Sequence, residues 1–192
     1  KWDYRISDPT KSPSVYMSER YAFLWKTSKI DIVGRAYLDK ELETKVYREP
    51  YIGKFKLKKA NKEFHIVNFH SRKHDDQPEL EIQYFKDYRN LLHSNNIIIA
   101  GDFNLDEKDP VWNDLYTQGF KSALQDTKTT LKRSCNSGSY LSYSIDNIYF
   151  SSGFSLVSSG VMDYIETCIN LDSARKISNH LPVFFQATIK TN

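Results

Sequence analysis

Ile97-Ile98-Ile99-Ala100-Gly101-Asp102-Phe103-Asn104 is the stretch that decides how the rest of the chain can fold. Its first four residues are apolar without interruption, which is typical of a strand buried on both faces of a sheet. Asp102 and Asn104 follow the glycine two residues apart, so in an extended chain both side chains point the same way. One carboxylate and one carboxamide at one point suit a hard cation or a phosphate. These eight residues alone are equally compatible with an ordinary polar turn at a strand end.

The whole chain has the size and composition of one folded domain. It contains 192 residues, of which 40% are hydrophobic and 14% are aromatic, and such a chain can form a core without metal or disulfide support. No stretch approaches the roughly 18 apolar residues of a membrane span, and no apolar signal segment follows Lys1. We therefore expect a single domain over residues 1–192, without a membrane span, that acts as a monomer.

The formal net charge of +3 hides an uneven distribution along the chain. Residues 1–74 carry 17 Lys and Arg against 9 Asp and Glu, whereas residues 75–192 carry 10 against 15. A basic first part suits a polyanionic partner, and an acidic second part suits a cation-binding rim. A solvated surface with uneven charge explains the same counts.

Two cysteines, Cys135 and Cys168, fit no metal-binding spacing. They can form one disulfide in an oxidising compartment, or they can be two free thiols. The spacing does not choose between these two states.

The remaining hydrophobic pattern predicts mainly strands, and therefore an α+β fold. Strands are expected over residues 18–25, 30–38, 51–58, 64–70, 97–104, 143–150 and 182–189, with a hairpin turn near 59–62. A long helix is expected from about 76 to 92, and a short helix from 109 to 119. Residues 4–18 and 126–142 have the composition of loops, and residues 151–176 have a mixed pattern.

Polar side chains stand where several of these strands end, which is where active-site groups commonly gather. They are His70, Asp102 with Asn104, Asp146, and Asn179 with His180. Two histidines with a carboxylate partner can act as an acid/base pair. Taken singly, each position also fits a structural role: a core histidine, a turn-bonded aspartate or a loop cap. Asn68 also fits a structural role, and Arg20 beside Glu19 fits a surface ion pair.

Taken together and in this order, these segments resemble the deoxyribonuclease-I-like endonuclease/exonuclease/phosphatase superfamily. The resemblance is carried by Asn68-Phe69-His70, Gly101-Asp102-Phe103-Asn104, Ser144-Ile145-Asp146-Asn147-Ile148 and Ser178-Asn179-His180-Leu181-Pro182-Val183. Two further segments, Ser18-Glu19-Arg20-Tyr21 and Arg48-Glu49-Pro50, are similar to the deoxyribonuclease I branch in particular.

The resemblance implies a four-layer sandwich, in which two mainly antiparallel sheets pack face to face with helices outside. It implies that His70 and His180 are the acid/base pair and that Asp146 orients His180. Asp102 and Asn179 would be metal ligands, and the groups contacting phosphate or substrate would be Asn104, Arg20 and Asn68. The implied cofactor is Mg²⁺, with Mn²⁺ or Ca²⁺ as alternatives.

Two departures from the superfamily pattern affect these expectations. The superfamily has an aspartate where this chain has Asn179, so a cation there loses one formal charge. The superfamily also begins with strands that carry an asparagine and a metal-binding glutamate, and a glutamate pairs with the histidine matching His70; no counterpart precedes Lys1. We therefore expect an N-terminally incomplete domain, and poor activity from these 192 residues alone.

The resulting hypothesis is metal-dependent hydrolysis of phosphodiesters, with DNA as the substrate of an endonuclease. Lys54, Lys56 and Lys58 share one side of a strand and are expected to help hold the DNA backbone without reading sequence; they equally suit a protected edge strand. The alternatives are a phosphodiesterase or phosphatase that acts on a lipid or small molecule, and a catalytically degenerate binding domain of the same fold. A secreted or periplasmic location is implied by resemblance only.

Overall fold

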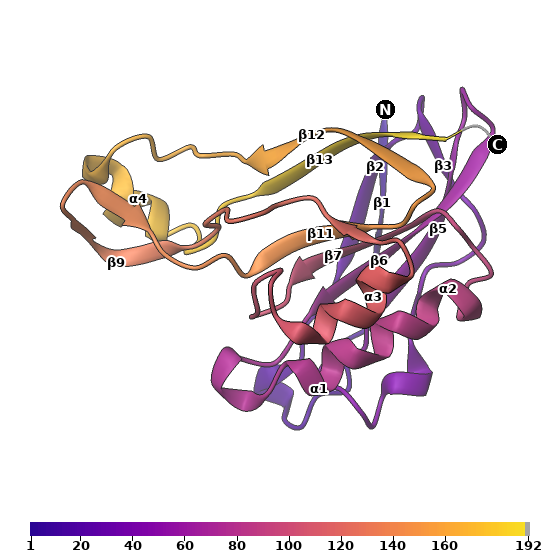
Figure 1. The fold of residues 1–192 in the computed structure, drawn as a ribbon, viewed down its shortest axis with the longest axis horizontal. Helices are drawn as coiled ribbons and strands as arrows, with labels where there is room; N and C mark the ends of the chain where they lie inside the picture. Colours follow the sequence, from indigo (N-terminus) through magenta and orange to yellow (C-terminus); the bar gives the residue numbers. More distant parts are fainter. Residues whose placement is uncertain (191–192) are drawn as a thin grey trace.

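A computed structural model describes residues 1–190 of the chain, and a seven-stranded sheet forms its centre (Figure 1). The strand order is β3 (Ile30–Ile32), β5 (Tyr51–Leu57), β6 (Lys62–His70), β7 (Ile97–Asp102), β11 (Asp146–Phe150) and β8 (Lys121–Ser122). β4 (Tyr37–Leu38) also pairs with β5. All neighbours are antiparallel except β6 and β7, which are parallel. A parallel pair needs a long crossover, and the helical segment between β6 and β7 provides it.

The apolar run at 97–100 forms the expected buried strand, β7. Ile97 and Ile99 have no exposed surface and point into the core beneath the helices. Ile98 and Ala100 point to the opposite face, where they pack in a second core. The uninterrupted apolar sequence is therefore explained by burial of both faces of the sheet.

Gly101 is required by the close approach of β6 to β7. Its φ is +155°, and a Cβ built there would lie 1.7 Å from the carbonyl oxygen of Phe69 on β6. No side chain fits at that distance, so any substitution would push the two strands apart. The glycine therefore sets the position of the next residue, Asp102, relative to β6.

The predicted hairpin over 51–70 is confirmed as β5 and β6, which pair from Tyr51 opposite Asn68 to Leu57 opposite Lys62. The single strand expected over 30–38 is wrong in its length. It is divided into β3 and β4, because Gly34 between them adopts a left-handed conformation with φ +73°.

Helical segments cover one face of the central sheet (Figure 1). The expected long helix is present but is interrupted, as α1 (Glu79–Ile82), a 3₁₀ segment (Gln83–Asp87) and α2 (Tyr88–Leu91). Its buried side is formed by Ile82, Phe85 and Tyr88. The expected short helix is confirmed as a 3₁₀ turn (Pro110–Trp112) followed by α3 (Asn113–Thr117), and Gly119 with φ +85° follows its end.

Two two-stranded sheets pack on the other face of the central sheet. One consists of β12 (Phe154–Val161) and β13 (Val183–Ile189), and the other of β1 (Trp2–Ile6) and β2 (Ala22–Lys26). β2 and β13 confirm two predicted strands, and the face-to-face packing of sheets confirms the α+β sandwich. The loop expected from residue 4 onward is wrong at its start, because β1 extends to Ile6. The apolar side chains of β1, Trp2, Tyr4 and Ile6, are exposed, so β1 does not belong to the hydrophobic core.

A separate lobe extends from one end of the sandwich, at the left of Figure 1. It contains a hairpin of β9 (Leu131–Asn136) and β10 (Ser139–Leu141), and α4 (Leu171–Arg175). Residues 126–142 were expected to be irregular, which is wrong for this hairpin. A disulfide joins Cys135 to Cys168, with a Cα–Cα distance of 5.7 Å, so the free-thiol alternative does not hold here.

Short 3₁₀ turns complete the described elements, at Val15–Met17, Lys40–Leu42, His74–Asp76 and Cys168–Asn170. Within residues 1–190, none of the helices is long and apolar enough to cross a membrane.

Candidate active site

Three neighbouring strands place three of the predicted site residues in one row. His70 ends β6 opposite Asp102 at the end of β7, and Asp102 is directly opposite Asp146 at the start of β11. Directly opposed side chains on adjacent strands lie within contact distance, and two like charges there repel each other. This row therefore needs positive charge nearby.

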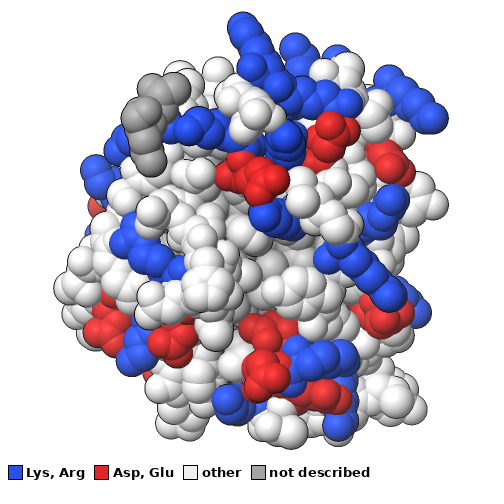
Figure 2. Space-filling model, turned by 90° about the vertical axis from the view of Figure 1, so that its right-hand side faces the viewer, with Lys and Arg blue, Asp and Glu red and all other residues white. Residues whose placement is uncertain are grey.

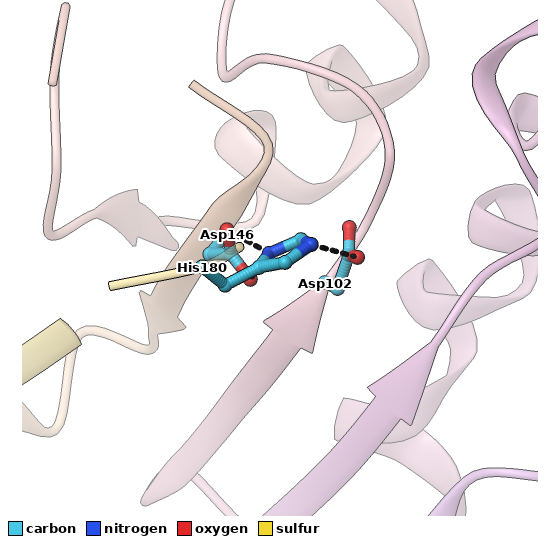
Figure 3. Close-up of side chains that lie close together, drawn as sticks. All are labelled: Asp102, Asp146 and His180. Carbon is cyan, nitrogen blue, oxygen red and sulfur yellow. Dashed lines mark hydrogen bonds and ion pairs between the residues drawn. The ribbon is translucent and has the colours of Figure 1, made fainter. Parts of the chain in front are cut away.

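His180 reaches the row from the loop between α4 and β13. Its backbone bridges to Thr130, and its Nδ1 lies 2.9 Å from Asp146 Oδ2 and 3.1 Å from Oδ1. An ionised carboxylate only accepts hydrogen bonds, so Nδ1 carries a proton and donates a hydrogen bond to Asp146. In Figure 3 the imidazole lies between Asp146 and Asp102, with Nε2 directed at Asp102. The hydrogen bond to Asp146 thus holds the ring in this direction, which is the contact that the expected role of Asp146 requires.

His70 has a carboxylate partner of its own, and this partner lies within the chain. Its Nδ1 lies 2.7 Å from Glu19 Oε2, and its backbone N–H donates to the hydroxyl of Tyr21. The expectation that no counterpart of this glutamate is present is therefore wrong. Glu19 stands in one of the segments that carry the resemblance, but in the sequence its neighbour Arg20 indicates only a surface ion pair. Glu19 and His70 are separated by 51 positions in the sequence, so no local pattern reveals the pair.

The two imidazoles converge on a single oxygen atom. His70 Nε2 lies 3.7 Å and His180 Nε2 lies 3.8 Å from Asp102 Oδ2. Burial, followed by the charge of Asp146, raises the pKa of Asp102, while the hydrogen bond that His180 donates to Asp146 raises the pKa of His180. Each Nε2 is left free by the carboxylate on the other side of its ring, so it can exchange a proton with a molecule bound between the rings.

The donor set fits a divalent cation. Ligand atoms of Asp102, Asp146 and His180 all lie within 4.8 Å of one another (Figure 3). Asp146 is already bonded to His180, which leaves Asp102 as the main acidic ligand. Mg²⁺ commonly binds through one or two carboxylates and completes its shell with water and substrate phosphate. The side chains present are therefore sufficient for a cation held partly by its substrate.

The remaining predicted residues lie at different places around this row. Asn104 has φ +52°, and its N–H donates to Asp102 Oδ1 at 3.0 Å, which turns the chain directly after β7. Asn68 lies on β6 two residues before His70, opposite Tyr51 and Ala100. Asn179 is exposed, and its backbone carbonyl accepts a hydrogen bond from the N–H of Leu131.

Arg20 is not brought into the row by any contact among the described residues. Its guanidinium donates to the carbonyl of Ser7 at 2.7 Å, and the residue is exposed. Arg48 is closer to the histidines, because its Nε lies 3.2 Å from Glu19 Oε1. The two segments that resemble the deoxyribonuclease I branch therefore meet through Glu19 and Arg48, beside His70.

The row of Lys54, Lys56 and Lys58 runs away from the histidines. Lys62, at the same end of the hairpin as Lys58, is eight residues from His70 on β6, roughly 26 Å at about 3.3 Å per residue. Figure 2 views that end of the molecule, where Lys and Arg side chains gather along the upper rim. Lys54 and Lys58 form ion pairs with Glu63 and Asp31. The row therefore cannot reach a phosphate held between the two histidines.

Solved structures with the same fold are endonuclease/exonuclease/phosphatase proteins. One from Bacteroides thetaiotaomicron aligns with a TM-score of 0.69 and 18% identity, over 99% of this chain and 76% of its own. The mannosyl-6-phosphatase Bt3783 of the same organism aligns with a TM-score of 0.69 and 18% sequence identity. The alignment covers 98% of this chain and 77% of the phosphatase. TDP2 of D. rerio, in complex with a single-stranded DNA product, aligns with a TM-score of 0.60 and 11% sequence identity. The alignment covers 96% of this chain and 77% of TDP2. The chain thus has the deoxyribonuclease-I-like fold.

Sequence comparison adds nothing to this similarity of fold. No family model matches the chain, and no curated protein matches it. At such low identity the similarity concerns the fold alone, so the activity of this chain has to be argued from its own side chains.

Proposed function

We propose that this chain hydrolyses phosphate esters with the help of a divalent cation, and that its substrate is a phosphodiester of DNA. The observation that carries the proposal is the pair of His–carboxylate dyads, Glu19–His70 and Asp146–His180. Their free Nε2 atoms lie 3.7 and 3.8 Å from one oxygen of Asp102. Two proton-transferring groups at one point suit a reaction that takes a proton from water and gives one to a leaving group.

The chain's own residues account for both proton transfers. With Nδ1 bonded to its carboxylate, each histidine presents Nε2 to the substrate. One imidazole starts neutral and accepts the proton of the attacking water at Nε2; the other starts as the imidazolium and donates its Nε2 proton to the ester oxygen that departs as the P–O bond breaks. The carboxylate behind each ring fixes its tautomer and stabilises the imidazolium that forms. Arg48, beside Glu19, is the basic side chain best placed to contact a substrate phosphate.

A bound Mg²⁺, or Mn²⁺ or Ca²⁺ in its place, would neutralise charge on the phosphoryl oxygens. Asp102 would be its principal ligand, with Asn179 as a neutral oxygen ligand. Asn104, directly after the turn that Asp102 caps, would contact the phosphate.

DNA is the proposed substrate because of the segments around the first dyad. Glu19 and Arg48, which carry the resemblance to the deoxyribonuclease I branch, contact each other beside His70. TDP2, which shares the fold, is found with a DNA product.

Incubation with supercoiled plasmid and Mg²⁺, with and without EDTA, tests the proposal. We expect nicking by the wild-type protein that EDTA and His180→Ala both abolish. His93→Ala is the matched control, because His93 is exposed and lies outside the row. Absence of nicking with every cation tested would overturn the proposed nuclease activity. Nicking by His180→Ala at the wild-type rate would overturn it as well.

A phosphatase is the second candidate, because the fold is shared with a mannosyl-6-phosphatase. Release of inorganic phosphate from a sugar phosphate or a phosphoinositide, without nicking, would favour it. Asn179 in place of an aspartate is the feature that favours a non-catalytic binding domain. Binding of DNA without hydrolysis of any phosphate ester would favour that third function.

We also propose that the protein works in an oxidising compartment, outside the cytoplasm. The support is the disulfide between Cys135 and Cys168, because such bonds persist mainly in secreted and periplasmic proteins. Thiol labelling of the protein taken directly from its native cells tests this, and two freely labelled cysteines would contradict it.

A further inference from the structure

Thr129 is a buried residue that contacts Asp146 and the segment that carries His180. It has no exposed surface, and it precedes β9 in the lobe that carries the disulfide. Its N–H donates to the carbonyl of Tyr143 at 2.7 Å, and its carbonyl accepts from the N–H of Leu181 at 2.7 Å. Tyr143 is three residues from Asp146, and Leu181 follows His180. The backbone of Thr129 thus ties together the two segments that supply the dyad.

The hydroxyl of Thr129 is bonded directly to the carboxylate of Asp146. Oγ1 lies 2.6 Å from Asp146 Oδ2, and it accepts from the N–H groups of Asp146 at 3.1 Å and Ile145 at 3.3 Å. A hydroxyl has one proton and two lone pairs. With both lone pairs accepting, its proton goes to the nearest acceptor, which is Oδ2 rather than the Tyr143 carbonyl at 3.3 Å. Every bonding capacity of this hydroxyl is therefore used at Asp146.

The same carboxylate oxygen accepts a hydrogen bond from His180 Nδ1. Because Asp146 Oδ1 is also only 3.1 Å from Nδ1, the imidazole alone would let the carboxylate rotate about its Cβ–Cγ bond and exchange one oxygen for the other. A second donor at Oδ2, fixed by the backbone around it, removes that freedom. Partners behind a functional side chain that fix its orientation in this way have a large effect on activity in other sites.

We propose that Thr129 is a positioning residue for the proposed hydrolysis: its hydroxyl fixes the plane of the Asp146 carboxylate, and through it the direction of His180 Nε2. Thr129 does not touch the substrate. This inference rests on the proposed function only for its kinetic readout.

Thr130 provides a matched control within the same lobe. It is also buried, and its Oγ1 accepts from the N–H of Tyr143 at 2.8 Å. No hydrogen bond joins its hydroxyl to Asp146 among residues 1–190. Valine at either position removes one buried hydroxyl of the same shape, so Thr129→Val and Thr130→Val should lose comparable stability. Only the first should disturb the dyad.

Kinetics of the whole protein with Mg²⁺ and a chromogenic phosphodiester test the proposal. For Thr129→Val we expect kcat to fall by about 10- to 100-fold, with little change in KM and wild-type secondary structure. Thr129→Ser, which keeps the hydroxyl, should recover most of the wild-type kcat, and Thr130→Val should retain it. Equal losses of kcat in both valine variants, or a wild-type kcat in Thr129→Val, would overturn the proposal.

A spectroscopic measurement keeps the test independent of activity. The Nδ1 protons of His70 and His180 should each give a low-field proton resonance, assigned by its loss in His70→Ala and in His180→Ala. Thr129→Val should lose the His180 resonance, while Thr130→Val should keep both. If the wild-type protein hydrolyses no phosphate ester, the proposed function fails, but this comparison still decides the role of Thr129. Retention of the His180 resonance in Thr129→Val would overturn it.

Discussion

Replacing Glu19 by glutamine tests the orientation of His70 with almost no change of shape. Glu19 interacts with two neighbours: Oε2 lies 2.7 Å from His70 Nδ1, and Oε1 forms an ion pair at 3.2 Å with Arg48 Nε, whose N–H donates to the carbonyl of Met17. A glutamine has only one carbonyl oxygen for these two positions. Arg48 has no acceptor and does not lose its proton, so the carbonyl must face Arg48 and the amide N–H must face His70. His70 Nδ1 then has to accept, and its proton moves to Nε2.

This tautomer change removes the lone pair that faces Asp102, and with it the ability of His70 to accept a proton at Nε2. A positioned acid or base contributes about 10² to 10⁴ in rate, so we expect kcat for Glu19→Gln to fall by about that factor. The effect on stability should be small, under about 1 kcal/mol, because Glu19 and His70 are both more than one third exposed and their interaction is screened.

The assay is phosphodiester hydrolysis with Mg²⁺, together with thermal unfolding. Glu63→Gln is the matched control, because Glu63 is 42% exposed, compared with 39% for Glu19, and pairs with Lys54 at 2.6 Å far from the histidines. The control should keep its kcat. If Glu19→Gln stays within about threefold of the wild-type kcat while His70→Ala is inactive, Glu19 does not set the tautomer and the reasoning is refuted.

Three further predictions concern the cation, the lobe and the response to pH. Asn179→Asp adds a formal charge beside the row and should tighten Mg²⁺ binding by about tenfold or more; calorimetric titration that finds unchanged affinity would exclude Asn179 as a ligand. Replacing Cys135 and Cys168 together by serine opens a crosslink across 33 residues, which should cost about 3–4 kcal/mol, measured by denaturant unfolding with the reduced wild type as control. Burial, followed by the charge of Lys54, holds the pKa of His65 below its ordinary value of 6.5. The unfolded chain therefore takes up this proton first, so stability should fall as the pH drops below about 6.5, and less so in His65→Gln; parallel Tm–pH curves for the two proteins would contradict this.

The elements that the sequence predicts correctly are those whose hydrophobic residues follow a regular spacing. The apolar run of β7, the alternating hairpin of β5 and β6, and the strand at 183–189 all follow from hydrophobic spacing. β1 was missed because Trp2, Tyr4 and Ile6 alternate but remain exposed. The break between β3 and β4 depends on the left-handed conformation of Gly34, which its sequence neighbours do not reveal.

The candidate site divides in a similar way. His70, Asp102, Asp146 and His180 were predicted because each stands near a strand end within a recognisable segment. β6, β7 and β11 align the first three in register, and the loop before β13 brings His180 to them. The role of Arg20 as a phosphate contact remains a prediction, since its guanidinium bonds the carbonyl of Ser7.

The sequence by itself determined the central strand, the glycine that lets β6 approach it, and the residue types available for the chemistry. These are local properties, because hydrophobic period and backbone freedom act over a few residues. Only the tertiary structure decided that Glu19 serves His70 and that Thr129 lies behind Asp146, whereas the pairing of Asp146 with His180 was already implied by the resemblance. Glu19 is 51 residues from His70, and Thr129 is 17 residues from Asp146. Hydrogen bonds between such distant residues depend on how the strands and the lobe pack, and nothing in the residues between them encodes the pairing.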